Sequence, residues 1–143
     1  MSKKKPTHHD AHLILELYDL RRETVMRQSR AAMVQWIPRS WDEFIAVTQP
    51  NHELNAAWRQ VSSYYEMAFG FARQGALHAE LLGENCGEGM LLFAKVKPYL
   101  ERFRKEVAPL AFRNAEWLVG HSEEARRRFK LMQERVSKLR DAK

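Results

Sequence analysis

Three histidines near the start of the chain have side chains that could bind a metal ion. His8 and His12 are four residues apart, so a helix would place them on one face, with His9 adjacent. A protein metal site commonly uses three or four ligands held by a stable structure. The segment adds only Asp10, and it lies close to a chain end. The sequence therefore predicts no metal site and no cofactor.

The single cysteine, Cys86, lies in the glycine-rich segment GENCGEG. A nucleophilic thiol needs a base and an orienting group within reach. The flanking Glu84 and Glu88 would instead raise the pKa of the thiol, because nearby negative charge disfavours the thiolate. The glycines also lack the following Lys and Ser or Thr of a phosphate-binding loop. We expect a turn between helices, no catalytic residue and no enzymatic activity; an exposed thiol in this loop is the alternative.

Arg21 lies within an apolar stripe of the first predicted helix. A guanidinium in such a stripe must reach solvent or meet a carboxylate, because an unpaired buried charge is very costly. We predict a buried ion pair between Arg21 and Glu66, with Tyr65 or Tyr64 as a neighbouring hydrogen-bonding group. Two alternatives remain open. Arg21, Tyr65 and Glu66 could form a polar pocket for a small anion, as in a ligand sensor, or Arg21 could be exposed.

The segment SEEARRRFKLMQERVSKLR, residues 122–140, combines an apolar seam with many cations. The apolar residues repeat at spacings of four, three, four and three, which is a heptad pattern that favours burial against another helix. This seam consists of Ala125, Phe129, Met132, Val136 and Leu139. We therefore predict a non-enzymatic interaction module that self-associates through this helix. The helix can pack against the other helices of its own chain or against a second copy, and the predicted partner of the protein is a second copy or another protein.

Nucleic-acid binding by the same helix is the alternative. The net charge of +6 is unevenly distributed, with +4 in residues 1–40, −3 in residues 41–100 and +5 in residues 101–143. Several cations have a glutamate four residues before them, which dilutes the positive field that phosphate binding requires. The cations left to form a basic face are Arg126, Lys130, Arg135 and Arg140. Membrane binding is less consistent with the acidic residues in the helix.

The sequence predicts that all the elements that position these residues are helices. Apolar residues repeat every three or four positions, and no stretch alternates long enough to indicate a strand. The fold class is therefore all-α, an irregular bundle of five to six helices in a single domain, residues 10–143, after a flexible basic tail, residues 1–9. We expect the long helices at 10–36, 52–74 and 88–107 to form the core, with a kink at Pro98 in the third.

The ends of the shorter elements carry capping signals. Ser40 opens a capping box with Glu43, Gly75 is a helix stop, and Ser122 begins the last helix. No apolar run approaches the roughly 18 residues of a membrane span. One cysteine cannot form an internal disulfide, so we expect a soluble cytoplasmic protein.

Three segments carry a family resemblance. They are HLILELYDLRRE, then VSSYYEMAFGFARQGALHAELL, and KVKPYLERFRKE followed by NAEWL. Together they resemble small bacterial all-helical proteins grouped as a domain of unknown function, the family numbered 4760. The resemblance covers most of the chain. It implies a bacterial helical domain and no catalytic residue.

Overall fold

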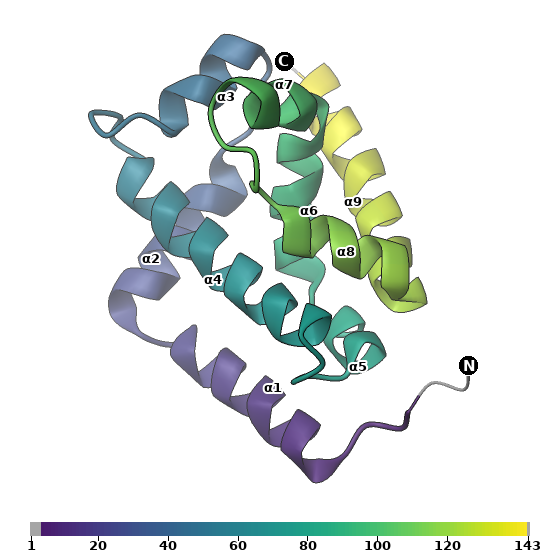
Figure 1. Ribbon diagram of the computed structural model, residues 1–143. Helices are drawn as coiled ribbons and strands as arrows, with labels where there is room; N and C mark the ends of the chain where they lie inside the picture. Colours follow the sequence, from purple (N-terminus) through teal and green to yellow (C-terminus); the bar gives the residue numbers. More distant parts are fainter. Residues whose placement is uncertain (1–3, 143) are drawn as a thin grey trace.

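The computed structural model describes residues 4–142, and every regular element within this range is a helix (Figure 1). The all-α class is confirmed, but the helices are more numerous than predicted because two long predicted helices are interrupted. In chain order the elements are α1 (His8–Leu20), α2 (Thr24–Gln35), α3 (Trp41–Val47), α4 (Asn55–Arg73), α5 (Ala79–Gly83), α6 (Gly87–Val96), the 3-10 helix η1 (Lys97–Tyr99), α7 (Leu100–Glu106), α8 (Arg113–His121) and α9 (Glu123–Asp141).

The first helix begins earlier than predicted. Thr7 is its N-cap, and the Asp10 carboxylate accepts a hydrogen bond from the Thr7 backbone N–H at 2.7 Å. Asp10 is therefore the third helical residue of a capping arrangement and not the cap itself. Of the predicted tail, residues 1–3 lie outside the described residues, while His8 and His9 belong to α1.

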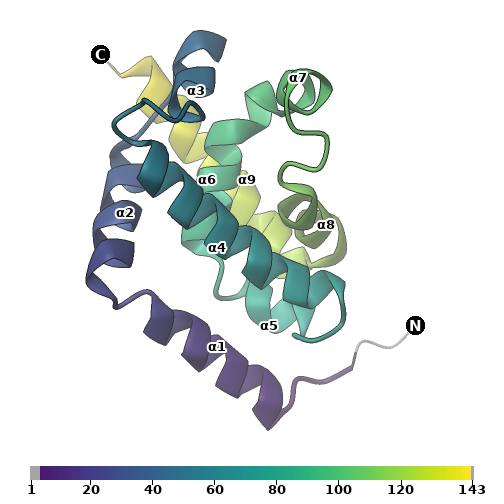
Figure 2. The same ribbon diagram turned by 60° about the vertical axis from the view of Figure 1, so that its left-hand side comes forward.

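The predicted continuous helix at 10–36 is wrong, because the chain turns sharply between α1 and α2 (Figure 2). The N–H groups of Arg21 and Arg22 donate to carbonyls three residues back, at 3.1 and 3.0 Å, which ends α1. The Glu23 side chain then accepts a hydrogen bond from the Met26 N–H at 2.9 Å and caps α2. No glycine or proline lies at this break.

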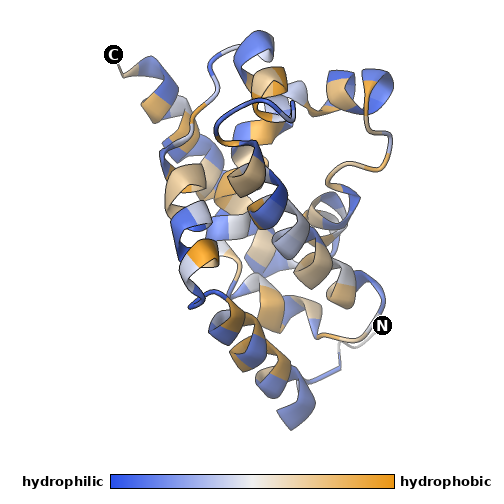
Figure 3. Cartoon of the chain, turned by 90° about the vertical axis from the view of Figure 1, so that its left-hand side faces the viewer, coloured by the Kyte–Doolittle hydropathy of each residue, from blue (hydrophilic) through white to orange (hydrophobic). Residues whose placement is uncertain are grey.

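The core is built around α4 and α6. Every residue from Gly89 to Val96 of α6 is buried, and α9 lies along this helix. Helices α2 and α8 contact α4, whose predicted stripe, including Trp58, Val61 and Tyr65, is buried. In contrast, α1 lies at the edge of the bundle in both views (Figures 1 and 2), and only Leu17 of α1 is fully buried. Hydrophobic and hydrophilic residues alternate along α1 (Figure 3).

An aromatic cluster fills the end of the core next to α3. Its centre is Phe44, which is fully buried. Ring centroids 5.0–6.4 Å from that of Phe44 belong to Trp36, Trp41, Trp58, Tyr99 and Phe103. These contacts join α3 and α4 to the turn around Pro98, where η1 separates α6 from α7 and interrupts the predicted 88–107 helix.

Candidate functional site

The densest polar group inside the fold is centred on Glu88, in the first turn of α6. Arg30 of α2 binds its carboxylate with two parallel hydrogen bonds, Nε to Oε1 at 2.7 Å and Nη2 to Oε2 at 2.9 Å. Tyr65 of α4 donates its hydroxyl to Oε1 at 2.9 Å. Arg21 adds an ion pair, Nη2 to Oε2 at 3.5 Å. We call these four residues the Glu88 cluster.

The Glu88 cluster is mostly withdrawn from solvent. The side chains of Arg21, Glu88 and Arg30 are 17%, 21% and 22% exposed. Burial, together with the negative charge of Glu88, raises the pKa of Tyr65, so this hydroxyl stays protonated and acts as a donor. Two cations and a hydroxyl surround one carboxylate, and charge-assisted hydrogen bonds of this kind fix the position of the Glu88 side chain. The cluster ties the end of α1 to α2, α4 and α6.

The predicted ion pair between Arg21 and Glu66 is wrong, because Arg21 lies against Glu88. The Glu66 carboxylate instead accepts hydrogen bonds from the backbone N–H groups of Asn114, at 3.1 Å, and Ala115, at 2.8 Å. Burial raises the pKa of Glu66, and these two hydrogen bonds oppose the rise. Glu66 therefore caps the start of α8, where the helix dipole favours negative charge.

Sequence reasoning missed the role of Glu88 because this residue was considered only for its effect on Cys86. The segment GENCGEG is the junction of α5 and α6, as predicted, and α6 begins at Gly87, one residue before the predicted start. The available signal was a glutamate in the first turn of a helix whose other positions are apolar. Such a carboxylate at a helix start is favourable to the dipole and needs partners when buried.

A small cavity lies between α1 and the α4–α6 region, beside Arg21 and Tyr65. Its volume is about 20 Å³, and its apolar wall includes Ile14, Leu17, Phe69 and Leu82. This volume suits one water molecule. Drug-sized ligands occupy pockets of about 300–1,000 Å³, so the cavity gives no support to a small-ligand sensor at this place.

Cys86 borders the same cavity but is almost completely buried. Its thiol donates to the Gly83 carbonyl at 3.2 Å. Burial raises the pKa of the thiol to about 12, with the positive charge of Arg128 opposing the rise. The predicted direction of the shift holds, but the cause is burial and not the flanking glutamates. A protonated, buried thiol is a poor nucleophile.

Lys95 of α6 is a second buried ion that sequence reasoning missed. Its side chain is fully buried, and Nζ donates to the carbonyls of Met33 and Val34 at the end of α2, both at 2.8 Å. Burial lowers the pKa of Lys95 to about 8, with Arg135 of α9 lowering it further. Lys95 therefore satisfies carbonyl groups that the last turn of α2 would otherwise leave unpaired.

The apolar seam of α9 is buried within the same chain. Ala125, Phe129 and Val136 are buried and Met132 and Leu139 are partly buried, with α6 and α5 as neighbours. The helix therefore packs against its own chain, which is one of the two arrangements predicted for it, and the predicted self-association through these side chains is wrong because they are already covered. A heptad pattern specifies that a helix needs a packing surface, but it does not specify which chain provides it.

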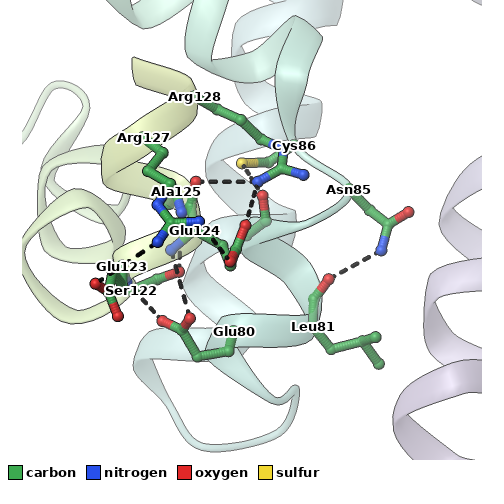
Figure 4. Close-up of polar contacts among 11 residues, drawn as sticks. Glu80, Leu81, Asn85, Cys86, Ser122, Glu123, Glu124, Ala125, Arg127 and Arg128 are labelled. Atoms are coloured by element: carbon green, nitrogen blue, oxygen red, sulfur yellow. Dashed lines mark hydrogen bonds and ion pairs between the residues drawn. The ribbon is translucent and has the colours of Figure 1, made fainter. Parts of the chain in front are cut away.

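The start of α9 is anchored by polar contacts with α5 (Figure 4). The Glu80 carboxylate accepts hydrogen bonds from the N–H groups of Glu123, at 2.6 Å, and Glu124, at 3.4 Å. The Ser122 hydroxyl accepts one from the Ala125 N–H at 3.0 Å, as its predicted position at the helix start requires. The start of α9 thus receives acceptors from its own N-cap residue and from α5.

The predicted basic face of α9 is only partly free. Arg126, Lys130 and Arg135 are exposed. Arg140 instead donates to the carbonyls of Pro38, at 3.1 Å, and Lys95, at 2.8 Å, so it joins α9 to the connection between α2 and α3 and to the end of α6. The basic face therefore loses one of its four predicted cations.

The three histidines of α1 lie on the surface of the protein. His8, His9 and His12 line an open surface hollow together with Glu16. Across residues 4–142, no three His, Cys, Asp or Glu side chains come together in a way suited to a metal ion. Over the same residues, no helix has the length and apolar character needed to cross a membrane.

The fold and the polar contacts define an all-helical protein in which buried ionic groups link helices to one another. A comparison with family models then places the chain: residues 6–122 match the domain of unknown function DUF4760. The protein belongs to this family, which confirms the resemblance seen in the sequence. Searches of the curated proteins and of the solved structures gave no match.

Proposed function

We propose that this protein is a non-enzymatic interaction module that self-associates through the corner formed by α1 and α2. The observation that carries this proposal is the concentration of exposed apolar side chains there. Of the eight large apolar side chains exposed among the described residues, four lie between positions 15 and 25. They are Leu15 (66% exposed), Tyr18 (42%), Leu20 (55%) and Val25 (55%). Grouped exposed apolar side chains are typical of protein interfaces.

The interior supports a structural role for the reactive side chains. Cys86, Lys95 and Glu88 each have hydrogen-bond partners that hold one protonation state or one geometry. None of the three lines a cavity large enough for an organic substrate. These contacts favour a protein partner over a small molecule.

A second copy fits the charges at this corner. Glu16 and Asp19 lie on α1, and Arg22 follows directly. Both signs of charge thus flank the apolar side chains. A two-fold axis places the same patch on both partners, so a surface with both signs can pair with itself.

The proposal is tested by the mass of the protein in solution. Multi-angle light scattering and sedimentation over about 10–500 µM protein, the range in which weak homodimers associate, should show a dimer. The double variant Leu20→Lys/Val25→Lys should be monomeric throughout. The matched control Leu110→Lys/Leu131→Lys changes residues that are 65% and 62% exposed, in the α7–α8 connection and on α9, and it should dimerise as the wild type does. A monomeric wild type, or a control that is monomeric while the first variant dimerises, would overturn the proposal.

Nucleic-acid binding remains a second candidate because of the exposed cations of α9. Arg126, Lys130 and Arg135 point to solvent from a helix whose other side is buried. If they bind phosphates, affinity for a DNA duplex should fall steeply as salt rises from about 50 to 200 mM. The triple change of these residues to glutamine should abolish the binding. Absence of binding at about 50 mM salt excludes this candidate.

A further inference from the structure

We propose that the dimer forms by exchange of α1, with the chain between α1 and α2 straightening into one continuous helix. The α1 helix of each copy would then occupy, in the other copy, the groove of α4, α5 and α6 that it fills within its own chain here. This inference rests on the proposed self-association and specifies how it occurs.

The first argument is the type of the residues that connect α1 to α2. Arg21, Arg22 and Glu23 connect α1 to α2, and Arg and Glu are good helix formers. Helix breaks usually coincide with glycine, proline or an inserted side chain. Here the bent conformation is held by the Arg21–Glu88 ion pair with α6 and by the Glu23 side chain, which caps the Met26 N–H within the break itself. The residue types at the break do not oppose a straight helix, so this cap is the local side-chain contact that favours the bend.

The second argument is the apolar pattern on both sides of the break. As one continuous helix, residues 10–36 would carry Leu13, Leu17, Leu20 and Val25 on one broad arc. In the bent structure this arc is divided: Leu17 is buried, whereas Leu20 and Val25 are each 55% exposed. A straight helix reunites the arc, and two such helices in a dimer can cover each other's exposed residues at the crossing.

The third argument is the weak attachment of α1. Only Leu17 of this helix is buried, while Leu13 and Ile14 are partly buried against the core. The Tyr64 hydroxyl donates to the Leu17 carbonyl, and the cavity of about 20 Å³ shows that the groove is incompletely filled. Releasing α1 breaks the Tyr64–Leu17 contact, the hydrogen bond from the His78 N–H to Asp10 and the Arg21–Glu88 ion pair, and the contacts of α1 with this groove re-form in the partner. This balance is what makes the exchange of identical elements a low-cost route to dimers.

Thr24 offers a substitution that separates the two forms. It is the first residue of α2, where proline is well tolerated because the N–H has no helical partner. The preceding Glu23 has φ −60° and ψ 142°, which is the conformation that a following proline favours. Thr24→Pro therefore fits the bent chain. In a straight helix it would fall in the interior, where it removes a hydrogen bond and clashes with the preceding turn.

Glu23→Ala acts in the opposite direction, because it removes the cap that begins α2 and places the best helix former in the break. A cap of this kind changes the equilibrium by roughly fivefold per chain. Each exchanged dimer has two such connections, so we expect the dimerisation constant to rise roughly 25-fold.

The experiment compares wild type, Thr24→Pro and Glu23→Ala by light scattering across the same concentrations, with melting temperatures to show that all three fold. Exchange predicts a dimer for the wild type, a folded monomer for Thr24→Pro and a tighter dimer for Glu23→Ala. If Thr24→Pro dimerises as strongly as wild type, exchange of α1 is refuted while the proposed self-association stands. If the wild type is monomeric throughout, both proposals fail.

Discussion

Replacing Lys95 with methionine should remove a rise in stability that the wild-type protein shows from about pH 7 to pH 9.5. Below pH 8 the Lys95 side chain is protonated in both the folded and the unfolded chain. Burial of this cation then lowers the free energy of unfolding, because the charge is desolvated only in the folded state. Between the folded pKa of about 8 and the ordinary value of 10.5, the folded chain has released this proton while the unfolded chain still binds it. Unfolding then takes up a proton, so the free energy of unfolding increases with pH.

The magnitude follows from the size of the pKa difference. A shift from 10.5 to about 8 is equivalent to about 3 kcal/mol, at about 1.4 kcal/mol per pKa unit. About 2 kcal/mol of this should be gained by pH 9.5, because that pH is about 1.5 pH units above the folded pKa, and the remainder is gained only as the pH rises through 10.5. A neutral amine can still donate two hydrogen bonds, so the contacts with the carbonyls of Met33 and Val34 survive deprotonation.

The assay is urea unfolding at a series of pH values for wild type, Lys95→Met and the exposed control Lys97→Met. Cys86 and Tyr65, whose raised pKa values lower stability at high pH, affect all three proteins alike. The difference between the wild-type and Lys95→Met curves should therefore grow by about 2 kcal/mol over this range, whereas Lys97→Met should run parallel to wild type. Parallel curves for all three would show that Lys95 is not buried as a strained cation.

Three further substitutions test the polar contacts and the packing by the free energy of unfolding. Glu88→Gln leaves two partly buried arginines without a counter-charge and should cost about 2–3 kcal/mol, less than a fully buried pair, while the exposed control Glu84→Gln should change stability by under about 0.5 kcal/mol. Glu66→Ala removes the acceptor for two N–H groups at the start of α8 and should cost about 1–2 kcal/mol; no loss would show that solvent replaces the cap. Gly89→Ala would place a methyl carbon 2.5 Å from the Phe69 ring and should cost about 1–3 kcal/mol. Gly120→Ala meets no atom within 4 Å and should be neutral or stabilising by up to about 1 kcal/mol, so equal losses for the two glycines would refute the close packing at α6.

The polar contacts between helices could not be derived from the sequence. The sequence indicates that Arg21 needs a carboxylate, but Glu66 and Glu88 both meet that requirement, and only the relative placement of α4, α6 and α8 decides between them. Lys95 gave no signal at all, because a lysine among apolar residues commonly reaches solvent along its flexible stem. Its burial depends on α2 and α9 covering α6 from both sides.

Local chemistry was enough wherever a feature depends on neighbours in the chain. The stripe of α4, the caps at Ser40 and Ser122, the stop at Gly75 and the interruption at Pro98 follow from periodicity, side-chain hydrogen bonding and backbone geometry within a few residues. The sequence by itself thus determined the helical class and many helix ends. The tertiary structure alone decided that the chain bends at residues 21–23 and that the α9 seam is buried in its own chain. Apolar stripes and charges in the sequence indicate that a side chain needs a packing or charge partner. Only the packing of segments that are distant in the chain provides that partner.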